Sequence, residues 1–201
     1  MQNLSSGQRQ RGILPRKINF KGGNQVRNPS IIKANQNDIK KISRLIQESI
    51  ENVGDPQYSK EQIEAWKTRY SEEKVEKKIG QELMFKLEEE GELIATISLH
   101  ESKVSALYIR HNQKGKGIGT QMLKFIEQKA KEEKMKKLEL SSTPIAVHFY
   151  EKNGYRKIRD NKFQIANTYL PQVIMGKEIT GCKDAGLPLD LLGLEPAGGC
   201  R

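Results

Sequence analysis

The sequence predicts one α/β domain in which a central mixed sheet is covered by helices. The chain has 201 residues, which is the length of one domain and enough to bury about 70 % of the unfolded surface. Helix-like and strand-like patterns follow one another in the order α α β β β α β α β β. Such alternation is typical of a single sheet with helical layers.

Two helices are predicted in the first part of the chain. Asn37 and Asp38 offer an N-cap for the first, and its apolar residues recur with helical spacing at Ile39, Ile42, Leu45, Ile46 and Ile50. Ser59 caps a second, short helix whose Trp66 is most simply a core residue. The charged run at 72–78 is predicted to be a solvated face without a chemical role.

Three strands come next, in the segments LMFKLEEE, ELIATISL and KVSALYIR, and the first two form a hairpin that turns at Gly91. A helix is predicted after residue 117, with Ile118, Met122, Ile126 and Ala130 in register. MKKLELSS is a further strand. Thr143-Pro144 starts the last helix, which ends at Gly154, and YRKIRD and YLPQVIMGKEI supply two more strands.

The ends of the chain differ in composition from its middle. We predict a basic disordered arm over residues 1–29, a folded domain over 30–180 and an irregular tail over 181–201. Residues 1–33 contain seven Lys or Arg and no acidic residue, so the arm carries most of the net charge of +10. Both cysteines, Cys182 and Cys200, lie in the tail, where they form neither a disulfide framework nor a metal-ligand set.

Several classes of protein do not fit this composition. No apolar stretch is long enough for a membrane helix, and the first residues lack the apolar core of a secretory signal. We therefore predict a cytoplasmic protein without a membrane or metal partner. The basic arm alone could bind nucleic acid, but no groove-reading motif accompanies it, so nucleic acid is not an expected partner.

The segment QKGKGIGT, residues 113–120, lies between a predicted strand and a predicted helix. A helix N-terminus presents free N–H groups and a positive dipole end, which bind anions. The spacing matches neither the phosphate-loop pattern nor the dinucleotide fingerprint. From these residues alone, an anion-binding turn and a plain strand-to-helix turn are both open.

Two motifs together resemble the GNAT superfamily of acetyl-CoA-dependent N-acetyltransferases. Its members carry (Q/R)-x-x-G-x-(G/A) at this turn and A-x-x-F-Y-x-x-x-G-(F/Y) in a later helix. The chain has the corresponding segments at 114–119 and 146–155, and Lys114 replaces the usual Gln or Arg. The resemblance covers about residues 30–178 and implies a GNAT-like fold with a mostly antiparallel sheet.

The resemblance also implies how acetyl-CoA binds. The backbone of Leu107 and Ile109 would pair with the pantetheine arm like an added strand. The pyrophosphate would lie on the turn that follows, which comprises Lys114, Gly115, Lys116, Gly117, Ile118, Gly119 and Thr120. No metal is implied.

Tyr150 is the predicted general acid. By resemblance, it protonates the departing CoA thiolate, and a phenol of pKa about 10 is protonated at neutral pH; the alternative is a core aromatic residue. Glu139 is the first candidate for the base, although it could be solvated. His100, Glu101, His111 or a water relay are the alternatives.

The predicted function is acetyl transfer from acetyl-CoA to a primary amine of a small molecule or peptide, directly within a ternary complex. No cysteine lies in the motif region to serve as a nucleophile. An inactive acetyl-CoA sensor or scaffold is the alternative function. The acceptor itself is not predicted, and a homodimer is open.

Overall fold

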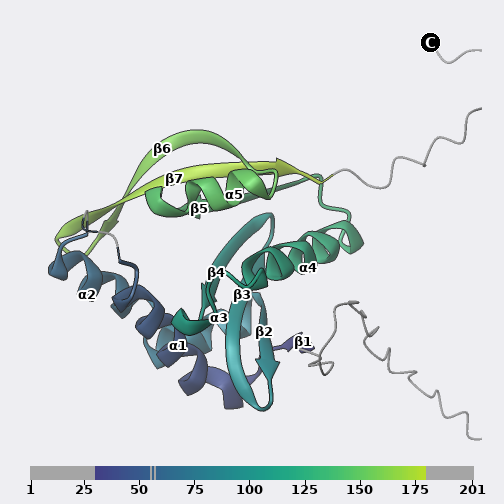
Figure 1. Cartoon of the computed structure of the whole chain (residues 1–201), viewed down its shortest axis with the longest axis horizontal. Helices are drawn as coiled ribbons and strands as arrows, with labels where there is room; N and C mark the ends of the chain where they lie inside the picture. Colours follow the sequence, from purple (N-terminus) through teal and green to yellow (C-terminus); the bar gives the residue numbers. More distant parts are fainter. Residues whose placement is uncertain (1–29, 55, 57, 180–201) are drawn as a thin grey trace, which may run out of the picture.

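The computed structural model describes residues 30–54, 56 and 58–179, and Figure 1 shows their arrangement. The described strands form one seven-stranded sheet in the order β1-β2-β3-β4-β5-β7-β6. Of its six pairings, only that of β4 with β5 is parallel. The predicted mixed, mostly antiparallel sheet is thus confirmed, whereas the predicted arm and tail lie outside the described residues.

The first half of the sheet is a meander with an added edge strand. It consists of β1 (Ser30–Lys33), β2 (Leu83–Glu89), β3 (Glu92–His100) and β4 (Lys103–Ile109). Glu90 and Gly91 both have positive φ between β2 and β3, as expected for a tight two-residue hairpin turn. The predicted hairpin is confirmed; β1 was not predicted, because four residues carry too short an alternation.

The helical segments between β1 and β2 include the two α-helices that cover one face of this half. The segments are η1 (Gln36–Asp38), α1 (Ile39–Glu51), α2 (Lys60–Thr68) and α3 (Glu72–Gln81). Asp38, one of the two residues predicted as N-cap, is the N-cap of α1, but its side chain makes no capping bond to that helix; it instead forms a capping box with Asn35 around η1. The charged run at 72–78 is indeed mostly exposed, but it forms α3, which buries Val75.

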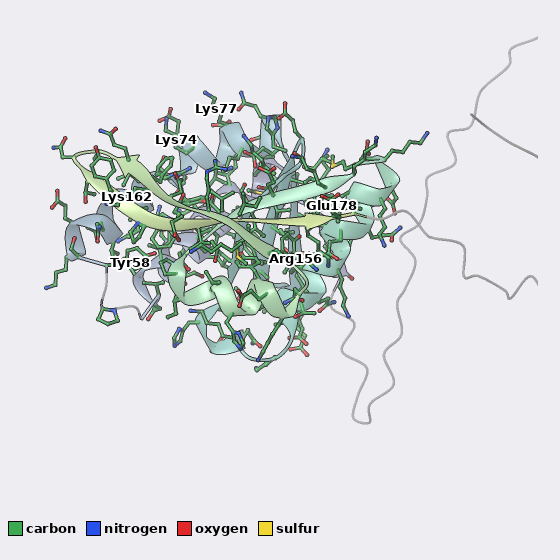
Figure 2. All side chains as sticks on the ribbon, turned by 90° about the horizontal axis from the view of Figure 1, so that it is seen from above. Tyr58, Lys74, Lys77, Arg156, Lys162 and Glu178 are labelled. Atoms are coloured by element: carbon green, nitrogen blue, oxygen red, sulfur yellow. The ribbon has the colours of Figure 1, made fainter. Side chains whose placement is uncertain are left out.

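The second half contains α4 (Ile118–Glu132), β5 (Lys137–Ser142), η3 (Pro144–Ala146), α5 (Val147–Lys152), β6 (Arg156–Ile165) and β7 (Thr168–Glu178). Strands β6 and β7 form a long hairpin whose closed end meets α2. Figure 2 shows Lys162, near that end, on the same side of the molecule as Tyr58, and Arg156 and Glu178 at the opposite side.

Hydrophobic clusters lie on both faces of the sheet. One joins α4 to the sheet through Met122, Leu123 and Ile126, as their helical spacing predicted. Another joins α1 and α3 to the opposite face and includes Ile42, Ile46 and Val75. A third, smaller cluster packs α2 against the β6–β7 hairpin and includes Tyr58, Ala65, Ile165 and Leu170.

Strands β4 and β5 separate soon after they meet. Their pairing is limited to Lys103 with Glu139 and Val104 with Leu140. The register of β3 with β4 shifts at this level, and Ala106 adopts a positive φ of 51°, the signature of a β-bulge. Beyond it, β5, β7 and β6 turn away from β1–β4 (Figure 1), so none of the described strands pairs with this edge at the end of β4.

Candidate active site

The unpaired edge of β4 presents backbone groups of Leu107 and Ile109. Arg110 N donates to Ile94 O at 2.9 Å, and Tyr108 pairs with Thr96, so these two residues face β3. Alternate residues of a strand turn their N–H and C=O groups to opposite edges, which directs those of Leu107 and Ile109 toward the diverging side. The Ile109 carbonyl accepts from Ser49 Oγ at 3.1 Å, which ties α1 to this edge.

The glycine turn follows directly and starts α4. Gly115 and Gly117 both have φ of +80°, a left-handed conformation that costs glycine little. Gly117 is the N-cap of α4 and no side chain caps the helix. The first intrahelical bond is donated by Gln121 to Gly117 O, so the N–H groups before it have no helical acceptor. An uncapped N-terminus of a 15-residue helix is suited to an anion.

Gly119 is needed for a different reason. A Cβ on this residue would lie 2.8 Å from Cζ of Phe149 and 3.2 Å from Cδ1 of Ile109. The first turn of α4 therefore sits directly on α5 and on the end of β4. Two of the alternating glycines have left-handed φ angles and the third makes a close helix contact. The strand edge, the turn and α5 therefore form one unit.

The two lysines of the turn are engaged with protein atoms. Lys114 Nζ donates to Asn52 O at the C-terminus of α1, at 3.2 Å, and Lys116 Nζ donates to Gln113 Oε1 at 2.8 Å. A cation at a helix C-terminus is favourable, so Lys114 connects the turn to α1. Its side chain can either hold the turn to α1 through Asn52 or place a positive charge beside an anion bound at the turn.

Tyr150 lies on α5 and is partly buried. Its ring contacts Phe149 and Tyr155 edge-on, at centroid distances of 5.0 and 5.9 Å. Burial raises the pKa of its phenol well above the usual 10, and the nearby phenol of Tyr70 adds to the rise. Tyr150 packs on the α4 face, whereas Tyr70 belongs to the cluster under α1. The effect of Tyr70 on this pKa therefore acts between the two faces of the sheet.

Glu139 is poorly suited to accept a proton. It pairs with Lys103, at the start of β4, rather than with the diverging end. Its carboxylate binds Lys137 Nζ at 3.0 Å, and this hydrogen bond holds its pKa below the ordinary value. A carboxylate with a lowered pKa is a weaker base. Its position in the strand is also unfavourable, because its neighbours Leu138 and Leu140 are buried on the opposite face.

The alternative bases are also remote or exposed. His100 and Glu101 lie at the turn between β3 and β4, at the opposite end of β4 from Ile109, and both are exposed. His111 is exposed in the short 3-10 turn after β4. Of these candidate bases, only His111 lies next to Ile109 and the glycine turn, and its side chain is exposed.

An aromatic cluster lies on the other side of the divergence. Trp66 of α2 donates its indole N–H to Tyr108 Oη at 3.1 Å. Tyr108 contacts Tyr70 edge-on at 5.2 Å, and Trp66 packs against Tyr58 at 5.6 Å. The spacing of these residues in the sequence gives no signal, because they come from α2, β4 and the segments that flank α2.

The arrangement can hold an extended acyl donor on a strand edge, its anionic end on a helix N-terminus, and a proton donor beside both. These features suit an acyltransferase that uses acetyl-CoA. The family described as "Acetyltransferase (GNAT) domain" matches residues 54–176. The chain belongs to this family and is a GNAT-type acetyltransferase, an enzyme of acetyl-CoA-dependent acyl transfer.

Solved structures share the fold. A GCN5-related N-acetyltransferase from Rhodopseudomonas palustris has 24 % sequence identity and a TM-score of 0.70, over 78 % of this chain and 99 % of that chain. The PaiA N-acetyltransferase from Thermoplasma acidophilum, in complex with coenzyme A, has 24 % identity and a TM-score of 0.63, over 75 % and 98 %. An aminoglycoside 6'-N-acetyltransferase complexed with coenzyme A has 16 % identity and a TM-score of 0.57, over 77 % and 99 %. No curated protein sequence matches significantly.

Two further observations concern partners. Among the described residues, no group of three or more His, Cys, Asp or Glu is placed to hold a metal ion. None of the described helices has the length and apolar character needed to cross a membrane. The predictions of a cytoplasmic location, of a metal-free reaction and of a homodimer stay predictions.

Proposed function

We propose that the protein transfers the acetyl group of acetyl-CoA to a primary amine of a small molecule or peptide, directly within a ternary complex. The observation that carries this proposal is the unpaired end of β4 beside the uncapped start of α4. One part offers hydrogen bonds to an extended amide chain, and the other attracts phosphate. An acetylated pantetheine with a pyrophosphate has both of these chemical parts.

Each part of the donor has a proposed partner. The N–H and C=O groups of Leu107 and the N–H of Ile109 bind the pantetheine arm, since Ser49 already occupies the Ile109 carbonyl. The N–H groups of residues 115–120 receive the pyrophosphate. Lys114 and Lys116 add positive charge beside it, and their present partners are a neutral carbonyl and an amide oxygen, which are exchangeable for phosphate.

The reaction is a nucleophilic substitution at the thioester carbonyl. The neutral amine attacks the carbonyl carbon, a C–N bond forms, and the C–S bond breaks as electrons pass to sulfur. The amine loses its proton to water, because Glu139 is bound to Lys137. Tyr150 donates its phenolic proton to the departing thiolate and regains one from solvent. Most of the rate enhancement comes from holding amine and thioester together.

The hydroxyl of Tyr150 is available for this role. Among the described residues it has ring contacts but no hydrogen-bond partner. Its raised pKa keeps it protonated at neutral pH. No observation favours the alternative of an inactive sensor.

The test measures acetyl-CoA binding by calorimetry and CoA release with a panel of amines. We expect binding and turnover in the wild type, and for Tyr150→Phe a kcat lowered by about 10²-fold or more with binding retained. Tyr169→Phe is the matched control, because this phenol is 53 % exposed on β7. Binding of acetyl-CoA without CoA release from any acceptor would favour the sensor instead.

A further inference from the structure

Arg69 occupies an unusual position for a charged residue. It is the C-cap of α2 and is partly buried. Its guanidinium carbon lies 4.0 Å from the centroid of the Phe163 ring on β6. Burial raises the pKa of the Tyr108 phenol, and the positive charge of Arg69 partly opposes this rise, so the guanidinium also lies within electrostatic reach of β4. Arg69 thus stands between α2, the β6–β7 hairpin and the aromatic cluster.

No acidic partner neutralises Arg69 among the described residues. Arg44 and Arg110 bind Glu48 and Glu92, and both pairs are substantially exposed. Arg69, although less exposed, makes neither an ion pair nor a side-chain hydrogen bond within that part of the chain. A carboxylate stabilises a partly desolvated guanidinium, because its two oxygens accept two parallel N–H hydrogen bonds from the planar group. Its donors are therefore free to receive a ligand.

The surface around Arg69 is aromatic and has no acidic residue on the same helix face. Residues three and four positions from Trp66 share its face of the helix, and these are Gln62, Ile63, Arg69 and Tyr70. The nearby acidic residues Glu51 and Glu64 both bind Lys67. A polycation would meet a positive charge here, whereas a flat apolar group would meet the rings of Trp66 and Tyr108.

We propose that the acceptor carries a carboxylate in addition to its amine, on an aromatic or otherwise flat apolar body, as in an aromatic α-amino acid. Arg69 binds the carboxylate, and Trp66 and Tyr108 contact the body. The amine then points toward the divergence of β4 and β5. This inference rests on the proposed acetyl transfer and names the acceptor class of the same site.

The test compares acceptors that differ only in the carboxylate. Initial rates of CoA release are measured with phenylalanine against 2-phenylethylamine, and with spermidine as a polycation without a carboxylate. For the wild type we expect kcat/KM to be at least tenfold higher for phenylalanine than for either other amine. Arg69→Gln should reduce the ratio of phenylalanine to 2-phenylethylamine at least tenfold, and Arg69→Lys, which keeps charge but loses the fork, should give an intermediate ratio.

Arg156→Gln is the matched control, because Arg156 is exposed on β6 and its loss removes the same charge; its ratio should stay within twofold of wild type. Circular dichroism confirms that each variant is folded. Equal wild-type rates with phenylalanine and 2-phenylethylamine, a preference for spermidine, or an unchanged ratio in Arg69→Gln would overturn the inference while leaving acetyl transfer intact. Acetyl-CoA binding without any CoA release would overturn both.

Discussion

Substitution of Gly119 by alanine tests whether the glycine turn is a packed unit with α5. The new methyl group would lie 2.8 Å from Phe149 Cζ, whereas carbon atoms in contact prefer about 3.5–4.0 Å. The ring or the start of α4 must therefore move by about 1 Å. Overpacking of this kind costs about 1–3 kcal/mol, and the better helix propensity of alanine returns at most about 1 kcal/mol.

The chain offers a matched control in Gly80→Ala. Gly80 is also helical, in α3, and a Cβ there would meet nothing within 4 Å. This variant should gain up to about 1 kcal/mol. Urea denaturation gives both free energies of unfolding, and calorimetry gives the affinity for acetyl-CoA, which we expect only Gly119→Ala to weaken. If Gly119→Ala matches wild type in stability and affinity, the close contact with Phe149 does not shape the site.

Three further predictions follow from single side chains. Because burial raises the pKa of Tyr150, its proton should remain available and kcat should not decline with an apparent pKa below 10; a pH–rate profile that falls earlier would contradict this. Lys114→Met should raise KM for acetyl-CoA several-fold with little change in kcat, and an unchanged KM in steady-state kinetics would limit Lys114 to tethering α1 through Asn52. Lys86→Met should destabilise the fold by about 3–5 kcal/mol in denaturant melts, because it leaves Asp38 buried without its partner; a loss under 1 kcal/mol would refute this.

The ion pair of Lys86 also sets a pH dependence. Burial alone lowers the pKa of Lys86, but its hydrogen bonds to Asp38 and Glu88 outweigh burial and raise it. A raised folded-state pKa stabilises the protein fully below the unfolded value of about 10.4. This contribution is lost as pH rises above that value. Unfolding free energies measured from pH 8 to 11 should thus fall at the alkaline end in wild type, and fall less in Lys86→Met.

The sequence by itself determined the class of the fold and the donor. The helices α1 and α4 could be predicted from their periodicity, because each buries one continuous apolar stripe. The turn at Gly115 and Gly117 could be predicted because a positive φ favours glycine over other residue types. The strand β1 and the helix α3 were missed, since four residues give β1 little pattern and α3 fully buries only Val75.

Only the tertiary structure decided which side chains meet. Lys137 lies two residues before Glu139 and its ammonium group binds the Glu139 carboxylate, which lowers the pKa of Glu139. No sequence pattern indicates whether the carboxylate of a strand residue is bound to a neighbouring cation. Arg69, Trp66 and Tyr108 come together because α2 packs on the β6–β7 hairpin while β4 and β5 diverge. Periodicity reports contacts within one element, whereas this cluster is built from several elements, so only the fold brings its residues together.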